Sequence, residues 1–345
     1  MAQDAESAPL PGLIRPTLAQ VASLAGVSLK TASRALNGEP NVARPTRVRV
    51  SRAADKLGFR PNSIARELRR GATSTLVGLI SGDLANPFYS AVASGVEREL
   101  RGCGLQLVMA SNDEDPERER TLIGAFLERR VSALLLMSAC ERHDDLALPG
   151  NHGVPFIFLD RRPLDAPGDV DAVVIDNRGG ARRAGEHLLR TGHRRIAVVG
   201  DPQRYTTHRE RIEGFVEAMT AAGNDCWRPY LSSAAHDLGT AERSVAELMR
   251  RDAPPTAIFT TNNRLTIGAL RALAGYQPPP ALVGFDDFDL GDVLGITVVA
   301  HGCEAMGRQA ARLALDRAGG QTDQPRIVTM PTQLVIRGSG ERAPQ

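Results

Sequence analysis

Residues 16–71 read PTLAQVASLAGVSLKTASRALNGEPNVARPTRVRVSRAADKLGFRPNSIARELRRG, and they begin with the pattern of two helices joined by a tight turn. The first helix is indicated by apolar side chains at helical spacing, at Leu18, Val21, Ala22 and Ala25. Gly26 ends this helix, and a second helix starts at once with Ser28 as its N-cap. Two helices joined by a glycine-containing turn predict a helix-turn-helix, whose second helix fits the major groove of DNA.

Charge separates this segment from the rest of the chain. Residues 15–71 hold 12 Lys and Arg against three Asp and Glu, a net charge of +9, whereas all 345 residues together carry only +2. A basic module attached to a near-neutral body is the electrostatic pattern of a DNA-binding protein. Double-stranded DNA is therefore the partner that charge and helix pattern both indicate.

The amino-terminal region extends beyond the two helices. A third helix is expected from Pro45 to Leu57, with Gly58 ending it. Residues 62–70 follow as a short helix that is too small to be stable without a partner. We therefore divide this region into a disordered, acidic tail at 1–15, a helix-turn-helix head at 16–60 and a hinge helix at 61–73.

Residues 74–340 have the alternating pattern of an α/β body. Apolar runs alternate with amphipathic helices, and the runs are TLVGLIS, LQLVMAS, ALLLMSA, PFIFLDR, AVVIDN, RIAVVGD, TAIFTTN and ALVGFDD. Near-continuous apolar strands at this spacing predict parallel sheets that helices cover on both faces. The number of units favours two sheets, and hence two lobes.

Bulk properties exclude several classes of protein. No apolar run approaches the roughly 18 residues that span a membrane, and the acidic amino terminus lacks the positive region of a signal peptide. The four cysteines include no C-x-x-C pair, which favours reduced, packed thiols over a disulfide or zinc site. These observations predict a cytoplasmic protein that needs no cofactor and no metal.

Eight short motifs, in this order, resemble the LacI/GalR family of bacterial transcription regulators over residues 17–340. They are Ala22-x-x-Ala25-Gly26-Val27-Ser28, Ser33-Arg34-x-Leu36-Asn37-Gly38, Gly58-Phe59-Arg60-Pro61-Asn62, Asn86-Pro87-Phe88, Asp160-Arg161, Asp176-Asn177, Gly192-His193-Arg194-Arg195-Ile196 and Gly284-Phe285-Asp286-Asp287. The resemblance implies a body like the periplasmic binding proteins, with crossing connections between the lobes. One lobe is expected at 74–173 plus 303–330, and the other at 174–302 plus 331–340.

The resemblance also implies how the head reads DNA. Leu29, Lys30 and Arg34 lie on one face of the second helix, and in the family these positions contact base edges. Arg34 can donate two hydrogen bonds to a guanine, which is worth roughly 1–3 kcal/mol against a wrong base. The remaining polar side chains are assigned to phosphates and helix caps, at Thr17, Ser28, Thr31, Ser33 and Asn37. The alternative is that Lys30 and Arg34 form only a solvated basic face.

The hinge helix is expected to contact the minor groove. By resemblance, Leu68 of each subunit inserts between base pairs and kinks the duplex, while Ala65 is small enough for close approach and Asn62 opens the segment. Two such helices side by side require a homodimer, and a two-fold dimer implies a near-palindromic operator. The alternative is that Leu68 packs on the body.

Polar residues at the ends of predicted strands mark a ligand site in the body, because open α/β sheets bind ligands there. By the family pattern, Arg209, Asn262 and Asp286 occupy effector-binding positions. Asp160, Asn86 and Phe88 lie close to them, and His301 is either a ligand contact or a cap. These groups suit a sugar or related polyol, since each hydroxyl both donates and accepts. For each of them a turn or capping role is the alternative.

Three departures from the family pattern affect the ligand. Asn262-Asn263 replaces the usual Asn-Asp, and His301-Gly302 replaces the usual Gln-Pro. An aromatic residue that often stacks on the sugar is missing near residues 236–237. We therefore expect a ligand to be held differently from a hexose in a typical relative.

The sequence thus predicts a dimeric, ligand-controlled transcription regulator, usually a repressor, rather than an enzyme. It contains no P-loop, no Gly-x-Ser-x-Gly and no His pair at metal-binding spacing. The alternative is a DNA-binding or chromosome-organising protein that acts without a ligand. A solute receptor is excluded by the basic head and by the lack of a secretion signal.

Overall fold

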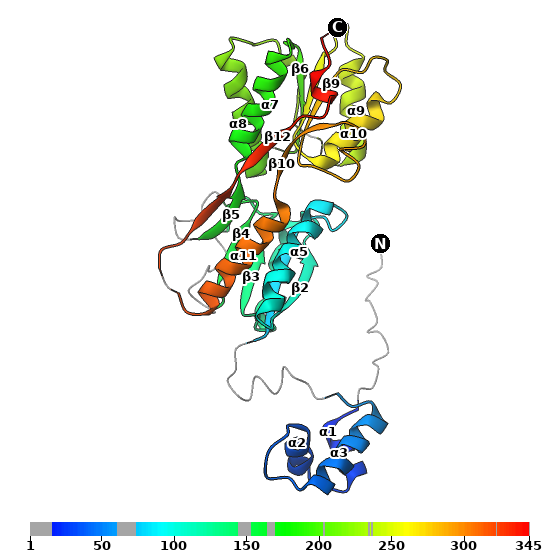
Figure 1. The fold of residues 1–345 in the computed structure, drawn as a ribbon, viewed down its shortest axis with the longest axis vertical. Coiled ribbons are helices and arrows are strands. Elements are labelled where there is room, and N and C mark those ends of the chain that lie inside the picture. The colour runs from blue at the N-terminus through cyan, green and yellow to red at the C-terminus, as the bar shows by residue number, and fades with distance from the viewer. Residues whose placement is uncertain are drawn as a thin grey trace, which may run out of the picture. The chain divides into compact units, whose positions relative to one another are not determined.

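The computed structural model describes residues 16–60, 74–143, 153–163, 170–202, 204–233, 235, 237–321 and 323–344. The chain divides into two compact units, residues 1–74 and 75–345, which are described separately below (Figure 1). The expected disordered tail and hinge helix, with Asn62, Ala65 and Leu68, lie outside the described residues.

Within the described residues 16–60, the first unit forms the helices α1 (Leu18–Ala25), α2 (Leu29–Leu36) and α3 (Arg44–Leu57). Ser28 caps α2 as the sequence predicts, since its hydroxyl accepts from the Thr31 backbone N–H at 3.1 Å. The structure adds a capping box between Thr17 and Gln20 at the start of α1. Gly26 and Gly58 close α1 and α3 in the left-handed region, both at φ 65°, a conformation that favours glycine.

Alanine dominates the core of this unit. The fully buried hydrophobic positions hold small side chains, while Leu18, Leu36, Leu57 and Phe59 pack partly buried around them. The fully buried residues are Val21, Ala22, Ala25, Ala32, Ala35, Val50, Ala53 and Ala54. Small side chains allow the helix axes to approach closely. The two buried positions of α2 are Ala32 and Ala35, so its opposite face is left to solvent.

The second unit contains two six-stranded sheets. The first has the order β11-β5-β4-β3-β1-β2 and is parallel throughout, with β1 (Leu76–Ser81), β2 (Gln106–Ser111), β3 (Ala133–Leu136), β4 (Phe156–Leu159), β5 (Asp171–Ile175) and β11 (Ile327–Met330). The second has the order β12-β10-β9-β8-β6-β7, with β6 (Ile196–Val199), β7 (Leu231–Ser232), β8 (Ala257–Thr260), β9 (Ala281–Phe285), β10 (Thr297–His301) and β12 (Thr332–Val335). Its one antiparallel pairing joins β10 to β12. The predicted α/β fold is confirmed, with two sheets that are parallel except for this pairing.

Helices cover both faces of each sheet, as the near-continuous apolar strands require. In the first lobe, successive residues of a strand such as β3 point to opposite faces of the sheet. The helices α5 (Pro87–Gly102) and α11 (Cys303–Ala318) cover one face, and α6 (Pro116–Glu128) covers the other. In the second lobe, α7 (Asn177–Arg190) and α8 (Thr206–Ala221) cover one face, and α9 (Leu238–Met249) and α10 (Asn263–Leu273) the other. Two 3-10 turns complete the body, η1 (Arg228–Tyr230) and η2 (Ser339–Glu341).

The chain crosses between the lobes after β5, after β10 and between β11 and β12. Figure 1 shows the result in α11, which follows a strand of the second lobe yet lies beside α5 of the first. Glycine makes this helix contact possible: a Cβ atom at Gly307 would lie 2.1 Å from the Val92 carbonyl oxygen. Because both lobes contain sequence from before and after the crossings, neither is a continuous segment.

No helix in the described part of the chain is both long enough and apolar enough to cross a membrane.

Candidate DNA interface and effector cleft

The solvent-facing side of α2 is the candidate DNA-reading surface. Leu29 is 54% exposed, and Lys30 is exposed beside it. Exposure of a leucine side chain to water is unfavourable, so its position on this surface suggests a contact with a partner. Ala32 and Ala35 hold the other side of the helix against α1 and α3. The amino end of α2 therefore presents one apolar and one basic side chain outward, as base contacts in a groove require.

Arg34 is oriented by a neighbouring carboxylate. Its Nε donates to Glu39 Oε2 at 2.9 Å, and Glu39 is held in turn by Arg47, whose Nη2 donates to the Glu39 carbonyl at 2.8 Å. The ion pair engages Nε rather than the two terminal nitrogens. Those terminal nitrogens are the pair that can donate side by side to a guanine.

The polar residues assigned to phosphates and caps lie on α2 and at the ends of α1 and α2. Thr17 caps α1, the Ser28 and Thr31 hydroxyls lie 2.8 Å apart at the start of α2, and the Asn37 amide donates to the Ser33 hydroxyl at 3.4 Å. Backbone N–H groups at a helix start attract anions. Thr17 and Ser28 stand at helix starts, whereas Asn37 is the C-cap of α2, so this effect applies to the first two only.

The body contains a cavity of about 550 Å³ where strand ends from both lobes meet. Its lining is strongly polar, with seven carboxylates and four arginines among the described residues. They are Asp83, Asp113, Glu114, Asp160, Asp201, Asp237 and Asp286, with Arg161, Arg204, Arg211 and Arg264. This cavity, which we call the effector cleft, is the candidate ligand site.

Asp160 and Asp286 occupy equivalent places in the two lobes. Asp160 follows β4 and Asp286 follows β9, each at the carboxyl end of its strand. Both adopt left-handed backbone conformations, with φ of 63° and 66°, and both are 8% exposed. Asp tolerates this region better than most residues but at some cost, and strain of this kind concentrates at functional sites.

Two cations hold Asp286 from the protein side. Arg211 Nη1 lies 3.4 Å from one carboxylate oxygen, and His301 Nε2 lies 3.0 Å from the other. Burial opposes ionisation, but Arg211 and His301 together keep the pKa of Asp286 below its usual range. Burial likewise disfavours the charged form of His301, yet hydrogen bonds to Asp286 and Cys303 raise the pKa of His301 to about 10. His301 is therefore an imidazolium at neutral pH.

This pairing predicts a pH-dependent contribution to stability. The folded-state pKa of His301 lies above the unfolded value of about 6.5, so its stabilising effect is present in full below pH 6.5 and is lost as pH rises toward 10. We expect His301→Gln to lower the free energy of unfolding by a few kcal/mol at pH 6, and by much less at pH 10. Urea denaturation of both proteins at the two pH values measures this; an equal deficit at both would contradict a charged His301.

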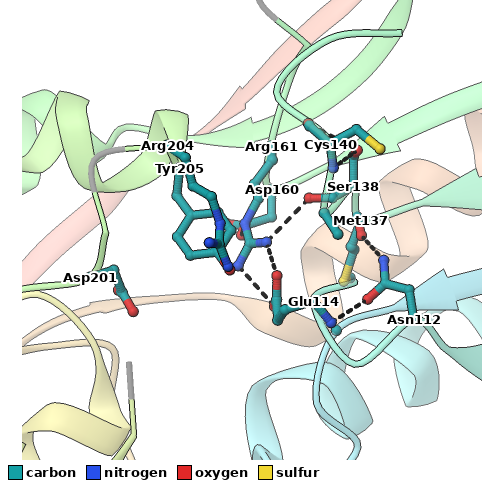
Figure 2. Close-up of polar contacts among 12 residues, drawn as sticks. Asn112, Glu114, Met137, Ser138, Cys140, Asp160, Arg161, Asp201, Arg204 and Tyr205 are labelled. Carbon is teal, nitrogen blue, oxygen red and sulfur yellow. Dashed lines mark hydrogen bonds and ion pairs between the residues drawn. The ribbon is translucent and has the colours of Figure 1, made fainter. Parts of the chain in front are cut away.

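The first lobe contributes a second charged cluster, around Arg161 (Figure 2). Its guanidinium pairs with Glu114, donates to the Ser138 carbonyl at 3.2 Å and lies over the Tyr205 ring at 4.1 Å from the ring centroid. The Tyr89 hydroxyl donates to Glu114 at 2.9 Å. Arg161 belongs to one lobe and Tyr205 to the other, so this contact crosses the cleft.

Other contacts cross between the lobes at the rim. The Asn263 amide donates to Asn86 at 2.9 Å, and Arg264 pairs with Asp83 at 3.2 Å. Asn263 stands where the family usually has aspartate. An ionised carboxylate has no hydrogen to donate, so the amide makes the bond to Asn86 possible. Polar side chains thus join the lobes at the rim of the effector cleft.

On the second-lobe side, Asn262 both caps α10 and orients a carboxylate. Its side-chain oxygen accepts from the Leu265 N–H at 2.9 Å, and its amide donates to Asp201 at 2.7 Å. Burial raises the pKa of Asp201 to about 6, against the smaller opposing effect of Asn262. The Asp201 side chain can therefore accept a hydrogen bond from a ligand hydroxyl when it is ionised, and can donate one when it is protonated below about pH 6.

Five of the seven residues assigned to the ligand line the effector cleft, namely Asn86, Phe88, Asp160, Asn262 and Asp286. Arg209 does not; its guanidinium pairs with Glu141 at 2.9 Å, and Arg211 faces the cleft instead. The two arginines stand two residues apart on α8, about 200° around the helix, so they point in different directions. His301 lies behind Asp286, with a side chain only 1% exposed, and supports that carboxylate from within the protein.

A basic helix-turn-helix head, joined to a two-lobed body with a polar cleft, defines a DNA-binding transcription regulator with a ligand-binding domain. Residues 17–62 match the family described as "Bacterial regulatory proteins, lacI family". Residues 74–278 match "Periplasmic binding proteins and sugar binding domain of LacI family". The chain belongs to the LacI family, which confirms the regulator function predicted from its motifs.

Relatives match over nearly the whole chain. The HTH-type transcriptional regulator CelR of Thermobifida fusca is 37% identical over 341 residues, covering 94% of this chain and 98% of CelR. The HTH-type transcriptional regulator PtxS of Pseudomonas aeruginosa is 32% identical over 340 residues, covering 96% and 97%. A solved structure of a CelR–cellobiose complex has 34% identity and a TM-score of 0.70, covering 94% of this chain and all of the other.

Proposed function

We propose that this protein is a dimeric repressor that reads a near-palindromic operator and is controlled by an uncharged saccharide in the effector cleft. The observation that carries the proposal is the composition of the cleft lining, seven carboxylates against four arginines, at the strand ends of both lobes. The proposed contacts with DNA are those of α2 and its caps. Because its operator is chromosomal DNA, the protein would act in the cytoplasm.

The charge of the cleft favours a neutral ligand over a phosphorylated one. Three of the four arginines already pair with carboxylates: Arg161 with Glu114, Arg211 with Asp286 and Arg264 with Asp83. A phosphate would have to displace these partners and enter beside the remaining carboxylates, which repel it. Sugar hydroxyls carry no charge, and they can donate hydrogen bonds to the carboxylates.

The size of the cleft admits more than one sugar ring. A volume of about 550 Å³ lies within the range of small-molecule sites, and aromatic surfaces of Phe88, Tyr89 and Tyr205 line part of it. The solved relative is a complex with cellobiose. We therefore propose a mono- or disaccharide, with a glucose disaccharide as the first candidate.

Control of DNA binding would follow from a ligand that touches both lobes. Asn86 and Asp160 come from the first lobe, while Arg211, Asn262 and Asp286 come from the second. A ligand in contact with both groups binds one lobe arrangement better than another, and it shifts the equilibrium by that difference in affinity. Because the relatives are transcriptional regulators, we propose regulation by binding, without catalysis.

The test has two parts, both on the full-length protein. Duplexes are first selected by the protein from a randomised pool, and we expect them to share an inverted repeat. Calorimetry is then run with glucose, cellobiose, their phosphorylated forms and a purine base. We expect a neutral saccharide to bind and to change affinity for the selected duplex; binding of a phosphate or purine alone would reject the proposed ligand class.

A further inference from the structure

A second cluster of ligand-type side chains lies in the first lobe, outside the effector cleft. It combines a carboxylate of α6, Glu119, with a thiol and an imidazole from the segment that follows β3, Cys140 and His143. One potential ligand atom of each lies within 4.8 Å of the others. Glu119 has no exposed surface and His143 is 4% exposed, while Cys140 is partly exposed.

The Glu119 carboxylate is held with one oxygen turned toward this cluster. Its Oε2 accepts from the Asn112 amide at 2.8 Å and from the Ala139 backbone N–H at 2.6 Å. Its Oε1 faces His143, with Nε2 at 3.7 Å. In metal sites, hydrogen bonds from neighbouring groups orient the ligating carboxylates in this way.

The three side chains are a thiol, an imidazole and a carboxylate, which are the protein ligands of zinc. Zinc bonds of about 2.0–2.3 Å place ligand atoms roughly 3.3–3.8 Å apart around a tetrahedral centre. The separation of 3.7 Å between Glu119 and His143 falls in that range. Cys140 and His143 form a C-x-x-H pair, so one short loop supplies two ligands.

We propose that Glu119, Cys140 and His143 bind one zinc ion, with solvent at the fourth position. Without metal, the Ser138 hydroxyl bridges the pair, at 2.8 Å from Glu119 Oε1 and 2.8 Å from His143 Nε2. A bound zinc ion would coordinate Glu119 Oε1 and His143 Nε2 in place of the hydrogen bonds that these atoms make with Ser138. The centroid of the Phe158 ring lies 5.3 Å from that of the His143 ring, so the imidazole packs against an apolar neighbour.

The position of the site connects it to the rest of the body. The same loop carries the Ser138 carbonyl that accepts from Arg161, and the Glu141 carboxylate that pairs with Arg209 across the lobes. Zinc would hold this loop in one conformation and, through it, the wall of the effector cleft. The proposal itself rests on the cluster alone and does not require the saccharide to be correctly assigned.

The experiment uses the full-length protein with its purification tag removed, stripped by a chelator and dialysed. Zinc is titrated by calorimetry and cobalt by absorbance, which reports a thiolate ligand through a charge-transfer band. We expect one equivalent per chain in the wild type and in Cys226→Ser, a matched change at an exposed cysteine. Cys140→Ser should abolish the cobalt band, and Asn112→Ala should weaken zinc binding about 10- to 100-fold.

Thermal unfolding separates binding from misfolding. Saturating zinc should raise the Tm of the wild type and of Cys226→Ser, because it binds the folded state. It should leave the Tm of Cys140→Ser unchanged; this residue is only partly buried, so the variant is expected to fold even if His143→Gln does not. Absence of saturable binding at one equivalent, or wild-type binding by Cys140→Ser, would overturn the proposal.

Discussion

Arg211→Met is expected to cost about 3–5 kcal/mol of unfolding free energy, because removing one partner of a buried ion pair leaves the other charge uncompensated. The Arg211 guanidinium contacts four groups: Nε donates to Asn177 at 2.8 Å, Nη1 donates to the Thr261 carbonyl and faces Asp286, and the group lies 3.8 Å from the Phe285 ring centroid. Saccharide affinity should fall by a further 10- to 100-fold or more, since hydrogen bonds to a charged group are worth about 1.5–3 kcal/mol. Urea denaturation and calorimetry measure the two effects.

Arg209→Met is the matched control for this prediction. It removes the same side chain two residues earlier on α8, where the guanidinium pairs with Glu141 and both groups are partly exposed. Pairs of this kind contribute about 0–1 kcal/mol, so its stability and saccharide affinity should stay near those of the wild type. If Arg209→Met were the more damaging change, the assignment of Arg211 to the cleft would be wrong.

Arg34→Ala is expected to weaken operator binding by about 30-fold to 20 000-fold. A bidentate arginine–guanine contact is worth roughly 1–3 kcal/mol, a dimer loses it twice, and each 1.4 kcal/mol is a factor of ten. The ion pair with Glu39 orients the guanidinium beforehand, so Glu39→Gln should produce a smaller loss in the same direction. Fluorescence anisotropy with a labelled operator at constant salt measures both.

The control for Arg34→Ala is the same substitution at an arginine outside α2. Arg52 is exposed on α3, and Arg52→Ala should weaken operator and random duplexes to a similar, small extent, as loss of a phosphate-type charge does. Arg34→Ala should instead reduce the ratio between operator and random duplex. An unchanged ratio would show that Arg34 does not read bases.

Local patterns were enough to predict the head and the class of the body. Gly26, Ser28 and Gly58 act at helix ends through hydrogen bonds to residues a few positions away, so local sequence is enough to predict these three caps. The apolar strands of the body likewise predict buried parallel sheets, because burial on both faces demands apolar residues at successive positions.

The cleft depended on contacts that no local pattern contains. Arg209 and Arg211 are both arginines of the same helix, and nothing in the local sequence shows which of them faces the cleft. The orientation of α8 over the sheet places Arg211 in the cleft and Arg209 beside Glu141. His301 could be read as ligand contact or cap until the fold placed it behind Asp286. Tyr205 was missed because its partner, Arg161, lies in the other lobe.

The sequence by itself therefore determined the helix-turn-helix, the two-lobed α/β body and the family, since short-range caps and strand patterns encode them. Only the tertiary structure decided which charged groups face the effector cleft, and only it brought Glu119 to Cys140 and His143. The physical reason is distance along the chain: burial and ion pairing depend on which segments meet, and the crossings between lobes bring together residues more than a hundred positions apart.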